Sequence, residues 1–254
     1  MDRRLTVVIL AAGLGKRMKS AKAKVLHEVL GKPMVVYVVE TARRIAGDAV
    51  VVVLGHQAEE VRKVVSRGAA VAFAYQQQLL GTGHAVMCAL PHIAAECEQV
   101  IVLCGDVPLV SDSTLNAMIA DHTEAGRDAT LLFVELERPF GYGRVLLDHR
   151  RQVCGIIEEA DATAEQRSIQ TINSGIYCLK HRFLADALPR LTRSNAQEEF
   201  YLTDIIRIGY EMGRNIGACR GKDPQEVLGI NTLDDLAQVE AFLAARRMQP
   251  AHEI

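Results

Sequence analysis

A glycine-containing loop near the start of the chain is followed at once by a group of cations. Residues 10–18 read Leu-Ala-Ala-Gly-Leu-Gly-Lys-Arg-Met, and glycines at positions 13 and 15 let the backbone approach a ligand and point N–H groups at it, which suits a phosphate. The group of cations consists of Lys16, Arg17, Lys19, Lys22 and Lys24. A triphosphate would be attracted to such a loop, and Arg17 and Lys24 are the predicted phosphate contacts. A tight strand-to-helix turn with a solvated basic surface is the alternative interpretation.

This loop fits neither of two familiar nucleotide-binding motifs. A Walker loop needs four residues between its glycines and then Gly-Lys-Ser/Thr, and the dinucleotide motif G-x-G-x-x-G fails because Met18 occupies the third glycine position. The second predicted strand ends at Leu54-Gly55-His56, without the acid that would bind a ribose. The sequence therefore disfavours a Walker-type nucleotide site and an NAD site.

Two oxygen-bearing side chains farther along the chain are candidates for metal chemistry. Asp106 follows the apolar run Val100–Cys104, and a metal explains an acid at the end of a buried strand better than packing does, with a helix N-cap as the alternative. Asn231 precedes the last amphipathic segment, where an N-cap is the ordinary interpretation. Its side-chain carbonyl is also a suitable oxygen ligand for magnesium, so both interpretations stay open at this point.

Several of these segments together resemble the nucleotidyltransferase signature of bacterial N-acetylglucosamine-1-phosphate uridylyltransferases. The matching segments are residues 10–18, Lys24-Val25-Leu26-His27, Gly31-Lys32-Pro33-Met34, residues 76–85 and Gly105-Asp106-Val107-Pro108-Leu109. The resemblance implies that Arg17 and Lys24 are catalytic. It also implies substrate contacts from Leu10, Ala11, Ala12, Gly13, Gly15, Gln76, Gly81, Thr82 and Gly105, with Gln76 reading the uracil edge. Thr82 is equally well placed to be the N-cap of a helix.

The second half of the chain carries further segments of the same resemblance. They are Gly141-Tyr142-Gly143-Arg144, Gly155-Ile156-Ile157-Glu158, Ile172-Asn173-Ser174-Gly175-Ile176, residues 195–204 and Gly229-Ile230-Asn231-Thr232. The resemblance implies that Gly143 accepts the N-acetyl group, that Glu158 and Asn173 bind the sugar ring, and that Thr203 and Asn231 contact substrate. It further implies that Asp106 and Asn231 hold Mg²⁺. Each segment alone would be an ordinary glycine turn or polar strand end.

The activity implied is transfer of uridylyl from UTP to N-acetylglucosamine-1-phosphate, giving UDP-N-acetylglucosamine and pyrophosphate for cell-wall precursors such as peptidoglycan. Departures from the family pattern include Leu79 for Gln, Ala160 for Lys, Ser174 for Thr and Glu198 for Gly. Transfer with another base or another hexose-1-phosphate is therefore one alternative. A catalytically silent module that binds a nucleotide sugar is the other, although it predicts loss of cation or metal positions that this chain retains.

The elements that must position these residues follow an alternating pattern. Short β-branched runs predict strands at 5–10, 49–54, 70–74 and 100–104, buried on both faces, with helices at 33–45, 57–66 and 82–90 between them. The second half predicts strands at 129–135, 144–147, 153–158 and 174–179, and helices at 183–191, 202–212 and 233–247, the last with an apolar face of Leu236, Val239, Phe242 and Leu243. The predicted fold class is α/β, a Rossmann-like nucleotidyltransferase fold with a mostly parallel mixed central sheet flanked by helices. Ligands then bind beyond the carboxyl ends of the strands.

Composition limits the classes of partner and compartment. The chain has 254 residues, 49% of them hydrophobic, and a formal net charge of −2, without the basic excess of a nucleic-acid-binding protein. It lacks an apolar stretch of about 18 residues and C-x-x-C pairs, so we expect no membrane segment, six reduced cysteines and a cytoplasmic location. The expected organisation is a nucleotidyltransferase domain over 1–232 and a C-terminal helix and tail over 233–254. The sequence has no six-residue repeat of the kind that forms a β-helix, so we expect no acetyltransferase β-helix domain. The sequence does not indicate the oligomeric state.

Overall fold

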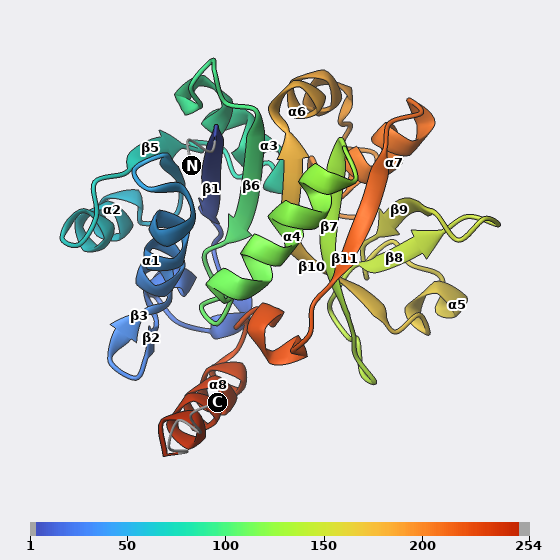
Figure 1. The fold of residues 1–254 in the computed structure, drawn as a ribbon. Helices are drawn as coiled ribbons and strands as arrows, with labels where there is room; N and C mark the ends of the chain where they lie inside the picture. The colour runs from blue at the N-terminus through green and yellow to red at the C-terminus, as the bar shows by residue number, and fades with distance from the viewer. Residues whose placement is uncertain (1–3, 249–254) are drawn as a thin grey trace, which may run out of the picture.

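One nine-stranded mixed sheet runs through the protein in a computed structural model, which describes residues 4–248 (Figure 1). The strand order is β11-β7-β10-β6-β1-β4-β5, and β8 and β9 are attached beside β10. The strands are β1 (Leu5–Ala11), β4 (Val50–Leu54), β5 (Ala72–Tyr75), β6 (Gln99–Cys104), β7 (Ala129–Glu135), β8 (Arg144–Leu147), β9 (Val153–Ile157), β10 (Thr171–Lys180) and β11 (Ile216–Arg220). A separate short hairpin is formed by β2 (Glu28–Val29) and β3 (Lys32–Pro33). This confirms the predicted α/β class with a mostly parallel sheet.

Helices cover both faces of this sheet. They are α1 (Met34–Ala46), α2 (Ala58–Ser66), α3 (Thr82–Ala89), α4 (Asp112–Glu124), α5 (Ala164–Arg167), α6 (His181–Ala187), α7 (Asp204–Glu211) and α8 (Leu233–Met248), with short 3₁₀ turns at Lys16–Met18, Lys24–Leu26, Leu90–His92, Leu188–Arg190 and Pro224–Val227. Apolar residues of α1, α2 and α4 form one core cluster with the sheet, and those of α3 and α6 form another on the opposite face. The sheet is therefore the middle of three layers.

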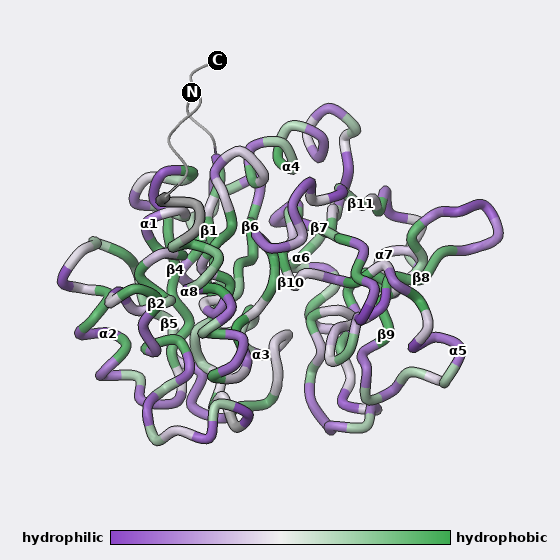
Figure 2. The backbone as a smooth tube through the Cα atoms, turned by 90° about the horizontal axis from the view of Figure 1, so that it is seen from below, coloured by the Kyte–Doolittle hydropathy of each residue, from purple (hydrophilic) through white to green (hydrophobic). Residues whose placement is uncertain are grey.

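The residues of β1 show why the sheet is buried on both sides. Val7 and Ile9 point into the cluster on the α1 side, whereas Val8 points into the cluster on the α3 side. Successive side chains of a strand point to opposite faces of the sheet. All three are fully buried because a core cluster covers each face. Figure 2 shows the resulting hydrophobic colour along the central strands and hydrophilic colour on outer loops. The prediction of doubly buried strands holds for β1, β4 and β6 but is wrong for the edge strand β5, where Tyr75 is 43% exposed.

Strand direction decides which loops meet at the site. β1 is parallel to both β4 and β6, so the segments after Ala11 and Cys104 lie at the same edge of the sheet. β10 runs antiparallel to β6, with Tyr177 opposite Val102. The beginning of β10 therefore lies beside the end of β6, and a segment distant in sequence reaches the edge where the first-half loops gather.

Helix α8 packs on the body of the protein near the β2–β3 hairpin (Figure 1). Val239 joins a small core cluster with Val29, Met34 and Ile230, and Leu236 and Leu243 pack against that cluster as predicted. The Leu30 amide donates to Glu240 Oε1 at 2.8 Å. The predicted tail from Pro250 lies outside the described residues. Within residues 4–248, no helix combines the length and apolar character needed to cross a membrane.

A buried histidine of α4 predicts acid-sensitive stability. His122 is 1% exposed, and its Nδ1 lies 2.9 Å from Thr130 Oγ1. Burial, reinforced by the charges of Lys180 and Arg127, lowers the pKa of His122 from 6.5 to about 4. Between pH 6.5 and 4, His122 therefore binds a proton in the unfolded chain but not in the folded protein. The free energy of unfolding falls as the pH drops through this range, by about 3 kcal/mol in total.

Urea unfolding at a series of pH values between 7 and 4 measures this loss. The His122→Gln variant is the control, because a neutral amide keeps a polar group beside Thr130 without titrating. The variant is expected to show a flatter dependence on pH over this window, and parallel curves for the two proteins would contradict the assignment.

Candidate active site

A cavity of about 400 Å³ opens beyond the carboxyl ends of β1, β5 and β6. Eleven of the residues predicted from the sequence line it: Leu10, Ala12, Gly13, Gly15, Arg17, Lys24, Gln76, Gly81, Thr82, Asp106 and Asn231. The remaining lining residues are Leu14, Val25, Leu79, Ala85, Cys104 and Glu199. The cavity lies where the parallel part of the sheet predicts a ligand, and its size is within the range of small-molecule sites.

Glycine occurs at the two positions of the first loop, 13 and 15, for different structural reasons. Gly15 has φ +63°, and a Cβ built there would come 2.5 Å from Lys24 Cβ, so the loop must have glycine for Lys24 to lie against it. A Cβ at Gly13 would meet no atom within 4 Å, so packing does not explain that glycine. Gly13 is exposed at the cavity, where the lack of a side chain leaves the backbone open to a ligand.

Four polar side chains from distant parts of the sequence converge at this cavity. The Lys24 ammonium contacts Asp106 Oδ2 and donates to Asn231 Oδ1 at 2.6 Å. Arg17 donates from its guanidinium to the same Asn231 oxygen at 2.8 Å. The separations in sequence are 82 residues between Lys24 and Asp106 and 214 between Arg17 and Asn231. We call Arg17, Lys24, Asp106 and Asn231 the polar cluster.

Neither oxygen donor of the polar cluster is a helix cap. Ser111, not Asp106, caps α4 by accepting from the Thr114 amide. At the start of α8 the Asp235 amide donates to Thr232 Oγ1, while Asp235 Oδ2 accepts from the Thr232 and Asn231 amides, so Thr232 is the cap. The N-cap alternatives for Asp106 and Asn231 are thus wrong.

The donor set of the polar cluster fits a hard divalent cation. The Asp106 carboxylate and the Asn231 amide oxygen both reach one ammonium nitrogen, so the two oxygens face a common point. Magnesium is commonly held by one or two protein oxygens together with substrate phosphates and water. In the part of the chain that the structure describes, no group of three or more His, Cys, Asp or Glu side chains could hold a metal by itself. A cation at this point would therefore depend on substrate for its other ligands.

Two other basic residues of the first loop, Lys19 and Lys22, lie on the surface. Lys19 is exposed, and Lys22 forms a 3.3 Å ion pair with Glu28 in which both side chains are about half exposed. Neither lines the cavity. The solvated interpretation therefore holds for these two lysines, whereas Arg17 and Lys24 reach the polar cluster.

The segment after β5 forms the apolar end of the cavity. Gln76 is 4% exposed, and its Nε2 donates to the Gly81 carbonyl at 2.9 Å. The N-cap interpretation of Thr82 is wrong: Gly81 is the cap residue of α3, and Thr82 Oγ1 accepts from the Leu202 amide at 3.0 Å instead. Leu79, where the family pattern has Gln, lines the cavity with an aliphatic side chain.

Ala11 and Gly105, two further predicted contacts, are not among the residues that line this cavity. Ala11 is 2% exposed in the core on the α1 side. The Gly105 amide donates to the Leu10 carbonyl at 2.9 Å, and a Cβ at Gly105 would lie 3.1 Å from that oxygen. Both residues therefore pack behind the lining residues and do not face the cavity.

The predicted sugar contacts Gly143, Glu158 and Asn173 and the predicted substrate contact Thr203 form a second group, which we call the sugar group. Thr203 Oγ1 donates to Glu158 Oε1 at 3.0 Å, and a Cβ on Gly143 would lie 3.4 Å from Glu158 Oε2. The Asn173 amide donates to the Gly143 carbonyl at 2.9 Å, and Asn173 Nδ2 donates to Tyr177 OH at 2.7 Å. Burial raises the pKa of Glu158, opposed by the Thr203 hydrogen bond. None of these four residues lines the cavity.

Cys104 connects the two groups. It lines the cavity, and its thiol donates to the Gly175 carbonyl of β10 at 3.6 Å. Burial raises the pKa of Cys104 to about 12, and the charges of Asp106 and Glu158 act in the same direction. The thiol is therefore protonated, and it lies close enough to Asp106, Lys24 and Glu158 for their charges to affect its pKa. All six cysteines are unpaired as expected, although only Cys97 and Cys178 are fully buried.

Glu198 carries backbone strain beside the cavity, next to the lining residue Glu199. Its φ is +53°, in the left-handed region that favours glycine, which is the residue the family pattern has there. We expect Glu198→Gly to raise the free energy of unfolding by about 1 kcal/mol, measured by urea or thermal unfolding. The exposed neighbour Gln197 has no positive φ, so Gln197→Gly should lower stability instead. Equal effects from the two variants would show that strain at 198 is negligible.

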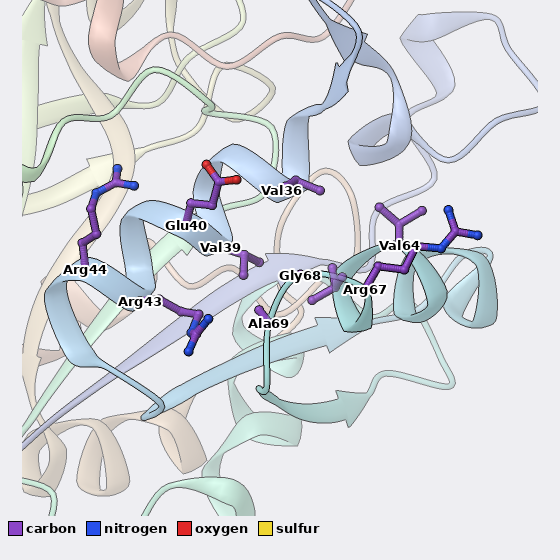
Figure 3. A pocket seen from close by; sticks show the side chains of 10 residues that line it. Val36, Val39, Glu40, Arg43, Arg44, Val64, Arg67, Gly68 and Ala69 are labelled. Carbon is purple, nitrogen blue, oxygen red and sulfur yellow. The ribbon is translucent and has the colours of Figure 1, made fainter.

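A second cavity, of about 490 Å³, lies between α1 and α2 (Figure 3). It is lined by residues along α1 and by the end of α2 with the turn that follows that helix. Arg43 and Arg44 line it but pair with Asp48 at 2.9 Å and Asp112 at 2.6 Å. Cations at helix carboxyl ends stabilise the helix dipole, which accounts for these arginines without a ligand. The cavity that contains the polar cluster is therefore the candidate active site.

Comparison with known proteins agrees with this geometry. The family model described as "MobA-like NTP transferase domain" matches residues 7–199. The chain is 46% identical over 242 residues to the "Bifunctional protein GlmU" of Geotalea uraniireducens, covering 95% of the chain and 53% of that protein. It is 44% identical over 248 residues to the protein of the same name from Geobacter sulfurreducens, covering 98% of the chain and 52% of that protein. The chain thus spans about half the length of the curated relatives it matches.

Proposed function

The chain belongs to the MobA-like NTP transferase domain family, and from this premise we propose that it transfers uridylyl from UTP to N-acetylglucosamine-1-phosphate. The observation that carries the proposal is the convergence of Arg17, Lys24, Asp106 and Asn231 at the mouth of a cavity lined by a glycine loop. The products are UDP-N-acetylglucosamine and pyrophosphate. The relatives are called bifunctional, and the proposal concerns this one activity only.

The reaction proposed is a single displacement at phosphorus. A phosphate oxygen of the sugar phosphate attacks the α-phosphorus of UTP; the new P–O bond forms as the bond to the β-phosphate breaks, and pyrophosphate leaves with that electron pair. Both reactants are strongly anionic, so positioning and neutralisation of charge supply most of the rate acceleration. No covalent intermediate with a protein side chain is needed.

Each residue of the polar cluster is proposed to have a separate role in this displacement. Arg17 and the backbone N–H groups at Gly13 and Gly15 bind the β- and γ-phosphates, and Lys24 stabilises charge that develops at the α-phosphate. Asp106 and Asn231 hold a divalent cation, which we propose to be Mg²⁺. Such a cation would neutralise phosphate oxygens of both substrates.

The remaining residues select the substrates. Gln76, Gly81 and Thr82 are proposed to contact the uracil, with Leu10 and Ala12 beside them and Ala11 and Gly105 supporting the loop. Gly143, Glu158, Asn173 and Thr203 are proposed to bind the N-acetylglucosamine moiety. The six unpaired cysteines support the proposal that the protein works in the cytoplasm.

Leu79 supports a second candidate with the same reaction and a different base. Its side chain lines the cavity where the family pattern places a second amide, so fewer polar groups are available to select uracil. The silent-module alternative has less support, because all members of the polar cluster are present.

Pyrophosphate release with N-acetylglucosamine-1-phosphate and Mg²⁺ tests the proposal, with UTP, CTP, dTTP, GTP and ATP supplied separately. Release with UTP alone is the expected result. Release with another nucleotide would keep the reaction and change the base, and a Leu79→Gln variant would then be expected to restore preference for UTP. If no nucleotide gives release but UDP-N-acetylglucosamine binds, the protein is a binding module.

A further inference from the structure

A fully buried arginine lies directly beside the proposed sugar residue Gly143. Arg144 is 1% exposed and is among the largest fully buried side chains of the described chain. Its guanidinium forms a 2.7 Å ion pair with Glu159 Oε2. Because burying a charge is costly unless it is paired and hydrogen-bonded, an arginine at this depth requires these partners.

The Arg144 guanidinium joins three separate segments. It donates to the Tyr142 carbonyl in the preceding turn and to the Arg167 carbonyl, at 3.2 Å, at the end of α5. Its ion-pair partner Glu159 lies in the loop after β9. Arg167 Nε in turn donates to the Glu159 carbonyl at 3.3 Å, which closes the connection. One planar group therefore fixes the turn, the loop and α5 relative to one another.

Each member of this ion pair is next in sequence to a proposed sugar contact. Arg144 follows Gly143, and Glu159 follows Glu158. The Glu158 carboxylate lies so close to Gly143 that a Cβ there would be 3.4 Å from Oε2. Any change in the distance between the two segments therefore changes the space between Gly143 and Glu158 directly.

We propose that Arg144 and Glu159 are positioning residues that set the geometry of the sugar-phosphate site without contacting substrate. This inference rests on the proposed function of Gly143 and Glu158. Lysine cannot replace Arg144, because a compact ammonium does not present the planar fork that serves Glu159 and two backbone carbonyls at once. Glu159→Gln removes the charge with almost no change in shape.

Steady-state kinetics with each substrate varied separately tests the proposal. We expect Arg144→Lys to raise the KM for N-acetylglucosamine-1-phosphate by about 10-fold or more while the KM for UTP stays near the wild-type value, because small misplacements at a site have large effects. Glu159→Gln should shift the same KM in the same direction. Equal changes in the two KM values, or no change in either, would overturn the proposal.

Arg127 provides the matched control. It also pairs with an acid, Asp121, and its side chain is 18% exposed, but it lies before β7 at the opposite edge of the sheet. Arg127→Lys therefore tests the effect of weakening a part-buried ion pair away from the site. It is expected to change thermal stability without separating the two KM values.

Hydrogen exchange of backbone amides distinguishes failure of this inference from failure of the proposed function. In Arg144→Lys, the amides of residues 141–143 and 158–161 are expected to exchange faster than in the wild type and in Arg127→Lys. Unchanged exchange would show that the ion pair does not hold these segments, whatever the enzyme does. Wild-type protein that fails to turn over any sugar phosphate, with the exchange result intact, would contradict the proposed function alone.

Discussion

Replacement of Asp106 by alanine is expected to lower kcat/KM for pyrophosphate release by about 10³-fold. Asp106 is the sole carboxylate of the polar cluster, and it faces the point that Asn231 and Lys24 also reach. Its loss removes the charge that would hold a divalent cation against the phosphates and leaves Lys24 without its anionic partner. Pyrophosphate release measured over a range of Mg²⁺ concentrations tests this, and excess Mg²⁺ should restore only part of the rate.

Asp128 offers a matched control for this variant. It also pairs with a lysine, Lys180, at 3.1 Å, but at the opposite edge of the sheet. Asp128→Asn should therefore leave magnesium-dependent turnover at the wild-type level. Full magnesium-dependent turnover in Asp106→Ala would instead show that the metal assignment is wrong.

Replacement of Lys24 by methionine is expected to lower kcat by about 10²-fold or more, with a smaller effect on the KM for UTP. Methionine keeps most of the volume of the lysine stem that lies against Gly15, so the loop should keep its conformation. The lost ammonium is the group proposed to stabilise charge that develops at the α-phosphate. A group that acts chiefly in the transition state affects kcat more than substrate binding.

The neighbouring Lys22 is the natural comparison, because it belongs to the same run of cations and lies on the surface with Glu28. Lys22→Met should retain wild-type kcat at moderate ionic strength. Equal losses in the two variants would mean that the loop acts through its overall charge. A wild-type kcat in Lys24→Met would remove Lys24 from the proposed mechanism.

The parallel part of the fold could be predicted because the residues of its strands strongly favour one structure, a strand buried on both faces. β1, β4 and β6 are runs of β-branched residues with no polar face, which is typical of strands covered by helices on both sides. Helix α4 was not predicted, although Ser111 is a strong N-cap and Leu115, Met118 and Ile119 follow at helical spacing. Its last buried position is His122, a polar residue that obscures the pattern. Strand β11 was missed because Gly217 and Ala218 have low strand propensity.

The candidate site divides in the same way between predictable and unpredictable parts. Residue type and motif spacing identified the members of the polar cluster, but the sequence contains no sign that Arg17 and Asn231 share a hydrogen bond across 214 residues. The assignment of Thr232 as the cap of α8 could have been made from the sequence, since Thr232 and Asp235 have the spacing of a capping box. With Thr232 as the cap, Asn231 is not needed to cap α8, and its side-chain oxygen is available as a ligand. The residues of the sugar group lie outside the lining of this cavity, which motif spacing in the sequence does not indicate.

The position of Asn231 just before α8 has a consequence for the order in which the protein is made. Chains emerge from the ribosome from the N-terminus, and domains begin to fold as they emerge. The glycine loop, Lys24 and Asp106 all precede Leu109, so these parts of the site are synthesised first. Asn231 is synthesised only after the segments that carry the proposed sugar contacts, and α8, which packs against the β2–β3 hairpin, follows it. The four members of the polar cluster can therefore come together only after the segments that carry the proposed sugar contacts have been synthesised.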